Sequence, residues 1–279
     1  MNQLVKKIVF TILFMMMFIG LAGCSNSSQS MNSVDSWKSI QKKGTVVIGI
    51  DDSFVPMTFR QKDGSLVGYD VDLAKKVFEK YDIQVDFQTI DWSMKETELK
   101  NGTIDLIWNG YTKTTARAKN VAFSRTYLTN KQVLVTKKSS EINSFSDMKQ
   151  KILGVQSGSA GFDSLNLHPD ILKDNIKDKE PVQYDSFDNA FIDLNADRIQ
   201  GLLIDDVYAN YFIKHQSNSN AYNVINGNFK TEDFAVGMRK SDTTMQLKIN
   251  RAITELQNKG YLKELNQKWF GENNNIQNN

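Results

Sequence analysis

The 279-residue sequence has one cysteine and two histidines, and this shortage excludes several kinds of chemistry. Cys24 alone can build neither a disulfide framework nor a cysteine metal site. His168 and His215 lie far apart and lack the spacing of a metal site or a catalytic triad. We therefore expect no bound metal. The glycine-rich segment 156–161 has neither the lysine of a phosphate loop nor the spacing of a dinucleotide fingerprint, so no cofactor is predicted.

An excess of one charge is also missing, because 34 Lys and Arg residues stand against 32 Asp and Glu residues. A balanced chain gives no reason to expect a nucleic-acid partner. Apolar residues make up 40% of the chain and charged residues 24%, which is typical of a globular body. A chain of this length is large enough for two lobes or one large domain.

The N-terminus has the pattern of a secretory signal. Lys6 and Lys7 precede a short apolar run, residues 8–21, and small residues follow it. The run is shorter than the ~20 residues that a transmembrane helix needs. It leads into L-A-G-C, residues 21–24, which resembles a bacterial lipobox and implies cleavage after residue 23 and lipidation of Cys24. An uncleaved signal anchor is the alternative.

Two segments outside the folded body are expected to lack fixed structure. Residues 24–35 are poor in large apolar side chains and rich in Ser and Asn, so we interpret them as a flexible tether. Residues 273–279 are rich in Asn and are interpreted as a disordered tail.

Strand and helix patterns alternate through the rest of the chain. The pattern of strands buried on both faces is found in four short uncharged runs, residues 45–50, 106–108, 152–155 and 201–204. Apolar residues at helical spacing follow Asp70, which is a plausible helix cap. The alternation predicts an α/β fold with largely parallel sheets. Ligands of such folds bind beyond the carboxyl ends of the strands.

The segment 105–128 gathers the strongest candidate residues. A buried strand leads through the turn Asn109-Gly110 and the hydroxyl of Thr112 to Arg117, which is expected early in a helix. Backbone N–H groups at a helix N-terminus and a planar guanidinium both suit a carboxylate. The alternative is an ordinary turn followed by a surface arginine.

Other candidates also fall at the ends of predicted strands. Asp51 and Trp92 each follow such a strand, and Asp205 ends the run 201–204. Asp205 either marks the rim of a cleft or merely caps the next helix, in which case Asp206 is the ligand group. The alternative for Trp92 is that its side chain is part of the hydrophobic core.

Six segments together resemble the polar amino-acid family of solute-binding proteins that serve ABC importers. They are GIDDSFVPMTF (49–59), GSLVGYDVDLAKKV (64–77), ELKNGTIDLI (98–107), TKTTARAKNVAFSRTY (112–127), FAVGMRK (234–240) and KWFG (268–271). The resemblance covers roughly residues 44–271 and implies a type II periplasmic-binding-protein-like fold.

That fold has two α/β lobes, joined by two crossover strands, and closes its ligand between them. The resemblance implies crossovers near residues 129–131 and 226–228. Lobe 1 would then hold residues 36–129 and 228–272, and lobe 2 would hold residues 130–227.

The resemblance also implies how an amino acid would be held by its α-groups. Arg117 would form paired bonds to the α-carboxylate, with the hydroxyl and N–H of Thr112 beside it. The turn at Ser159 and Ala160 would add N–H groups. The carbonyl oxygen of Gly110 and the carboxylate of Asp205 would accept from the α-ammonium.

The resemblance says less about the side chain of the ligand than about its α-groups. Phe54 and Trp92 would flank it, with Asp51 and Asn109 at its far end. The family commonly has a serine pair where this chain has Asn109-Gly110, and a second hydroxyl where it has Ala160. These departures leave amide, basic, aromatic and cystine ligands open.

The resemblance implies a monomeric, lipid-anchored protein on the outer face of a Gram-positive cell membrane. It would deliver a polar amino acid to an ABC permease and would not be an enzyme. One alternative is an enzyme on the same fold, such as a dehydratase or lyase, which needs a general acid or base in the cleft. Another is a ligand-sensing partner of a membrane receptor.

Overall fold

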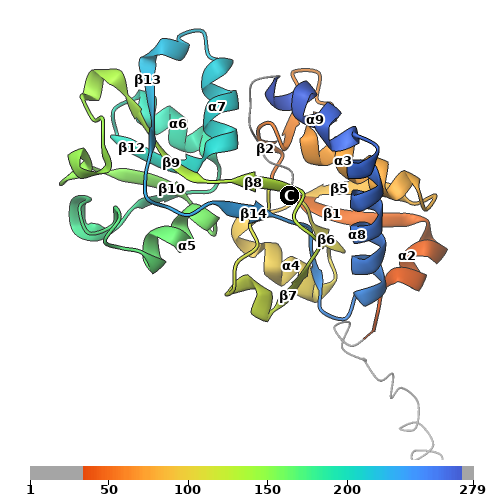
Figure 1. Cartoon of the computed structure of the whole chain (residues 1–279). Coiled ribbons are helices and arrows are strands. Elements are labelled where there is room, and N and C mark those ends of the chain that lie inside the picture. The colour runs from red at the N-terminus through yellow and green to blue at the C-terminus, as the bar shows by residue number, and fades with distance from the viewer. Residues whose placement is uncertain (1–33, 272–279) are drawn as a thin grey trace, which may run out of the picture.

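The computed structural model describes residues 34–271, which form two α/β lobes joined by extended strands (Figure 1). The predicted signal peptide, Cys24, most of the tether and the C-terminal tail lie outside these residues. Within residues 34–271, no helix combines the length and the apolar character needed to cross a membrane.

Lobe 1 is built on a five-stranded sheet with the strand order β5-β1-β6-β15-β7. The strands are β1 (Thr45–Ile50), β5 (Gln84–Thr89), β6 (Leu106–Ile107), β7 (Val121–Phe123) and β15 (Gly237–Arg239). β1 pairs in parallel with β5 and β6, whereas β15 is antiparallel to β6 and β7. The sheet is therefore mixed, because a strand from the end of the chain returns between two earlier ones.

Helices cover both faces of this sheet, because alternate residues of a buried strand point to opposite sides. Val46 and Ile48 of β1 pack into the core shared with α3 and α8, whereas Val47 packs against the core that contains Leu99 of α4. The helices of lobe 1 are α2 (Trp37–Lys43), α3 (Tyr69–Glu79), α4 (Lys95–Asn101), α8 (Thr243–Asn258) and α9 (Tyr261–Phe270). A small sheet beside them contains β2 (Ser53–Phe54), β3 (Thr58–Arg60) and β4 (Leu66–Val67).

Lobe 2 repeats this plan with the strand order β11-β10-β12-β9-β13. Its strands are β9 (Gln132–Lys137), β10 (Leu153–Gln156), β11 (Val182–Tyr184), β12 (Gly201–Asp205) and β13 (Tyr222–Asn226). Its helices are α5 (Ala160–Leu167), α6 (Phe187–Asn195) and α7 (Asp206–Lys214). Four short 3₁₀ turns complete the lobe, η5 (Lys138–Ser140), η6 (Phe145–Met148), η7 (Lys177–Lys179) and η8 (Ser219–Ala221).

Two antiparallel strands, β8 (Leu128–Asn130) and β14 (Glu232–Phe234), pass between the lobes (Figure 1). The predicted α/β fold with two lobes and two crossover strands is confirmed. The second crossover pairs with the first only from Glu232, later than the predicted residues 226–228, because β13 stays in the lobe 2 sheet until Asn226. The exact division of the chain into lobes stays a prediction.

The start of α3 differs from the expectation, because Gly68 rather than Asp70 stands at the cap position. Gly68 has a φ of 146°, and a Cβ atom there would lie 2.2 Å from the carbonyl oxygen of Met57. Only glycine fits so close an approach of two backbones. Asp70 is instead buried in the first turn of the helix, where its side chain has another role.

Arg239 is a buried cation of lobe 1. It lies on β15 with 5% of its side chain exposed, and its guanidinium forms ion pairs with Asp105 at 3.0 Å and Asp242 at 2.9 Å. It also donates to the carbonyl oxygen of Ile104 at 2.9 Å. These contacts join the central sheet to the segment before β6 and to the start of α8.

We expect the substitution Arg239→Met to lower the free energy of unfolding by about 3–5 kcal/mol, because it leaves buried carboxylates without a cation. Urea denaturation followed by circular dichroism measures the change. The control is Arg251→Met, which removes an exposed arginine paired with Glu255 and should leave the midpoint nearly unchanged. Equal losses in both variants would contradict this account of Arg239.

Candidate functional site

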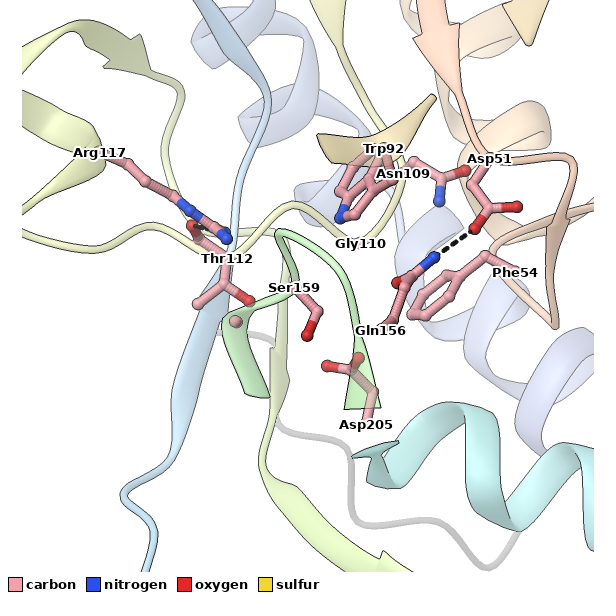
Figure 2. A pocket seen from close by; sticks show the side chains of 11 residues that line it. Asp51, Phe54, Trp92, Asn109, Gly110, Thr112, Arg117, Gln156, Ser159 and Asp205 are labelled. Carbon is pink, nitrogen blue, oxygen red and sulfur yellow. Dashed lines mark hydrogen bonds between the residues drawn. The ribbon is translucent and has the colours of Figure 1, made fainter. Parts of the chain in front are cut away.

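A cavity lies between the lobes, and its lining includes all ten residues predicted for the ligand site (Figure 2). The lining consists of Asp51, Phe54, Trp92, Asn109, Gly110, Thr112, Arg117, Ser159, Ala160 and Asp205, together with Gln156, which sequence reasoning missed. The structure brings these residues together, while their roles in binding stay predictions.

The cavity has its lining at the carboxyl ends of strands from both sheets. Lobe 1 supplies the segments after β1 and β6 and the short turn η3 (Trp92–Met94) after β5. Lobe 2 supplies the end of β10, the turn before α5 and the last residue of β12. Gln156 is the last residue of β10, so the same strand-end rule identifies it as a candidate.

The expectation that Arg117 lies early in a helix is wrong, because the residue lies in a single 3₁₀ turn, η4 (Arg117–Lys119). The contribution of a helix N-terminus therefore falls away, and the guanidinium itself carries the positive charge. Arg117 donates to the carbonyl oxygen of Thr112 at 3.0 Å and to Asp163 of lobe 2 at 2.9 Å. It also lies over the Tyr111 ring, 4.8 Å from the centroid. With only 6% of its side chain exposed, it is not a solvated surface arginine.

Lys95 is a second buried cation at this boundary, and sequence reasoning did not identify it. Its Nζ donates to the carbonyl oxygen of Trp92 at 3.0 Å and, across the lobes, to that of Gly158 at 2.8 Å. Burial lowers the pKa of Lys95 to about 7, and the nearby charge of Arg117 adds to the effect. Trp92 is held in place by this contact and by an edge-on contact with the Tyr111 ring.

Asp205 lies in the cavity on the lobe 2 side. It directly precedes α7, but its side chain makes no capping bond. Instead it accepts hydrogen bonds from Asn130 and Gln132, the latter at 3.0 Å. The alternative residue Asp206 is absent from the cavity lining and accepts from Asn210 of its own helix. The structure therefore favours Asp205 over Asp206 as the cleft carboxylate.

Glu232 is a further carboxylate that sequence reasoning missed. It accepts from Gln132 at 3.0 Å, from Asn130 at 3.3 Å and from the hydroxyl of Thr112 at 3.2 Å. Burial raises the pKa of Glu232. Burial and the neighbouring charge of Glu232 raise the pKa of Asp205 to about 8. The cavity lining thus has the guanidinium of Arg117 in one part and the carboxyl group of Asp205 in another, with the carboxyl group of Glu232 next to Asp205.

The far part of the cavity has unused hydrogen-bonding capacity. Asp51 accepts from Ser53 and, across the lobes, from Gln156 at 2.8 Å (Figure 2). Burial raises the pKa of Asp51. Asn109 is 2% exposed, and within the described part of the chain its amide oxygen has no hydrogen-bond partner. An N–H donor brought into the cavity would satisfy that oxygen.

Asp70 holds the backbone of Gly110, one of the residues that line the cavity. Its carboxylate accepts from the N–H of Gly110 at 2.7 Å and from the Tyr127 hydroxyl at 3.0 Å. Complete burial raises the pKa of Asp70 to about 7. The acid expected to cap α3 therefore positions Gly110, one of the predicted ligand residues. Among residues 34–271, no group of three His, Cys, Asp or Glu residues is placed to hold a metal ion.

Residues 46–272 match the family model of the bacterial extracellular solute-binding proteins, family 3. A substrate-binding protein of an ABC uptake transporter from Streptococcus pneumoniae, solved with bound histidine, is 53% identical and has a TM-score of 0.84. The match covers 85% of this chain and 97% of that chain. A polar amino acid uptake protein from Streptococcus thermophilus is 49% identical, with a TM-score of 0.56 and coverage of 88% and 93%.

The arginine-binding extracellular protein ArtP of Bacillus subtilis is 28% identical over 269 residues, which are 95% of this chain and 98% of that protein. These relatives are substrate-binding proteins of transport systems and not enzymes, as the sequence predicts for this chain.

The raised pKa of Asp70 predicts how stability depends on pH. The folded protein keeps this proton up to about pH 7, whereas the unfolded chain releases it near the ordinary value of 3.8. Asp70 therefore favours folding at low pH, and this contribution is lost as the pH rises from about 4 to 7.

We expect Asp70→Asn to remove that dependence. The difference in unfolding free energy between wild type and variant should fall by up to about 1.4 kcal/mol per pH unit. Urea denaturation from pH 4.5 to 7.5 measures it, with the exposed Asp86→Asn as control. Parallel curves for wild type and Asp70→Asn would show that Asp70 is ionised when folded.

Proposed function

The chain belongs to family 3 of the bacterial extracellular solute-binding proteins, and on this premise we propose that it captures a polar amino acid between its lobes and delivers it to an ABC permease. One observation carries the proposal. The guanidinium of Arg117 and the carboxylate of Asp205 line the same cavity from different lobes (Figure 2). A zwitterion with a carboxylate and an ammonium group is the ligand that such a pair complements.

Binding would be coupled to closure of the lobes. Bonds already cross between them from Gln156 to Asp51 and from Arg117 to Asp163. A ligand that contacts Arg117 in lobe 1 and Asp205 in lobe 2 adds a further bridge, so it favours the closed arrangement over an open one. We propose that the chain acts as a monomer, with a cavity lined from both lobes of one copy.

The far part of the cavity favours a side chain that donates N–H groups. The free amide oxygen of Asn109 and the carboxylate of Asp51 are both acceptors. Phe54 and Trp92 offer ring surfaces against which a planar group can pack. The Streptococcus pneumoniae neighbour was solved with histidine, whose imidazole has these properties. We therefore propose L-histidine as the first ligand to test, with other amide and basic amino acids next.

The available groups are sufficient for useful affinity. Each hydrogen bond to a charged group contributes about 1.5–3 kcal/mol. A micromolar dissociation constant corresponds to about 8 kcal/mol. A few such bonds at the α-groups, with packing of the side chain, supply this after the entropy lost on association.

A thermal-shift screen of the twenty standard amino acids and cystine tests the function, followed by calorimetry on each ligand that raises the melting temperature. We expect at least one polar amino acid to bind. Arg117→Ala should weaken it at least about 30-fold, because truncating one side of a buried charge contact costs about 2 kcal/mol or more.

The control for Arg117→Ala is Arg198→Ala, which removes an exposed arginine paired with Asp193 on lobe 2. It should bind like wild type. If no amino acid binds, the proposed function is wrong. If Arg117→Ala binds as tightly as wild type, the function stands and the assignment of Arg117 fails.

We further propose that the mature chain is anchored through lipid on Cys24, on the outer face of the membrane of a Gram-positive bacterium. The lipobox-like L-A-G-C sequence supports this. Two acyl chains on one residue hold a protein at a membrane stably, whereas one chain binds only marginally.

Cys24→Ser should move the protein from the membrane fraction of expressing cells to the culture medium, and Ser27→Ala is the matched control. Cell fractionation and the mass of the N-terminal peptide measure the outcome. A wild-type protein whose N-terminal peptide still carries residues 1–23 and an unmodified Cys24 would instead support the uncleaved signal anchor.

A further inference from the structure

The strand pairing at the crossover brings the carboxyl group of Asp205, in the cavity lining, together with that of Glu232, which is outside the lining. Asn130 and Gln132 are two residues apart on one extended segment, so their side chains point to the same side. Glu232 pairs with Asn130 in the ladder of β8 and β14, and Asp205 pairs with Gln132 in the ladder of β9 and β12. The backbone register therefore places Asp205 and Glu232 as neighbours, independently of how the lobes are arranged.

The two carboxyl groups share their hydrogen-bond donors. The amide nitrogen of Gln132 donates to Asp205 and to Glu232, at 3.0 Å in each case. The amide nitrogen of Asn130 also donates to both. Glu232 additionally accepts from the Thr112 hydroxyl. Within residues 34–271, neither carboxyl group forms an ion pair with a lysine or arginine.

The surrounding charges do not neutralise the pair. Arg117, from lobe 1, is the cation that acts on both groups, and it is engaged with Asp163. Lys131 and Asp206 flank Asp205 on its own side of the cluster. The outer groove beside Glu232 is lined by Lys113, His168, Lys230 and Asp233, with the Ser164 hydroxyl facing inward.

Asp205 is buried and Glu232 is half-buried. Two carboxylates on the same donors repel one another when both are ionised. Such a pair titrates as a unit, and its first ionisation leaves one proton shared between the two groups. Burial raises the pKa of both members, that of Asp205 to about 8. The shared donors and the raised pKa values of both groups therefore favour a pair that holds one proton and one negative charge.

We propose that Glu232 is the positioning partner of Asp205 in the ammonium site, and that capture of the ligand ammonium releases the proton the two carboxyl groups share. This inference rests on the proposed function of the same cavity. The ammonium stays protonated and contacts Asp205. One carboxyl O–H bond breaks, and its proton passes to water or buffer. Glu232 acts through Asn130, Gln132 and Thr112 without touching the ligand.

The coupling gives affinity a defined pH dependence. Below the range in which the pair ionises, each ligand bound must displace a proton, so the dissociation constant falls as the pH rises. The limit for one proton is about tenfold per pH unit. From pH 7.0 to 8.0 we expect the affinity for L-histidine to rise about three- to tenfold.

The experiment is calorimetry of the mature protein with L-histidine at pH 7.0, in phosphate and in Tris, whose ionisation enthalpies differ. The two heats give the number of protons released. Lys95 and the ligand imidazole can also exchange protons at this pH, so the informative quantity is the difference between wild type and Glu232→Gln. We expect wild type to release about half a proton to one proton more per ligand bound than Glu232→Gln releases. Asp233→Asn removes an exposed acid on the same strand and should behave like wild type.

Each outcome is decisive. Equal proton release by wild type and Glu232→Gln overturns the inference while leaving the binding function intact. If Glu232→Gln does not fold, the wild-type series decides, and an affinity that stays constant or falls from pH 7.0 to 8.0 overturns it. If L-histidine does not bind wild type, the same titrations use the amino acid found by the thermal-shift screen. If none binds, the proposed function and this inference fail together.

Discussion

An ionised side chain can be buried between two lobes only if other groups replace the water that it loses. This constraint explains the construction of the cleft. Arg117 is compensated by the carbonyl oxygen of Thr112 and the carboxylate of Asp163, and Lys95 by two carbonyl oxygens. Asp205 and Glu232 have amide donors but, among the residues that the structure describes, no cation in direct contact. These two carboxyl groups, which a cation would stabilise, therefore lie at the end of the cavity where the ligand ammonium is proposed to bind.

The crossover strands connect the lobes and also carry residues next to the proposed ammonium site. β8 and β14 join the lobes, and the same two strands carry Asn130 and Glu232 at paired positions. A change of charge at the ammonium site therefore acts directly on the segment about which the lobes would move. The acid end is different, because Arg117 belongs to a short turn of lobe 1 and reaches its lobe 2 partner through its side chain alone.

Sequence patterns identified the cavity lining well because strand ends are local features. Asp51, Trp92, Asn109 and Asp205 were found by this rule. The segment 105–128 by itself indicated Gly110, Thr112 and Arg117, and the family resemblance added the other predicted residues. Gln156 also ends a strand, but the glycine-rich turn that directly follows it is the more conspicuous feature of the sequence. The expectations for Asp70 and Arg117 failed for one reason. The sequence shows that a helix or turn begins nearby, but long-range contacts with Gly110 and Asp163 decide what each side chain does.

The sequence by itself determined the α/β class, the family and the strand ends at which the cavity lies, because apolar periodicity and short motifs are written along the chain. Only the tertiary structure decided which buried charges are compensated and which are not. The hydrogen-bond partners of Glu232 lie 68 to 120 residues away in sequence. They meet because the registers of separate strand pairs place them on one face, and register depends on the packing of the whole sheet.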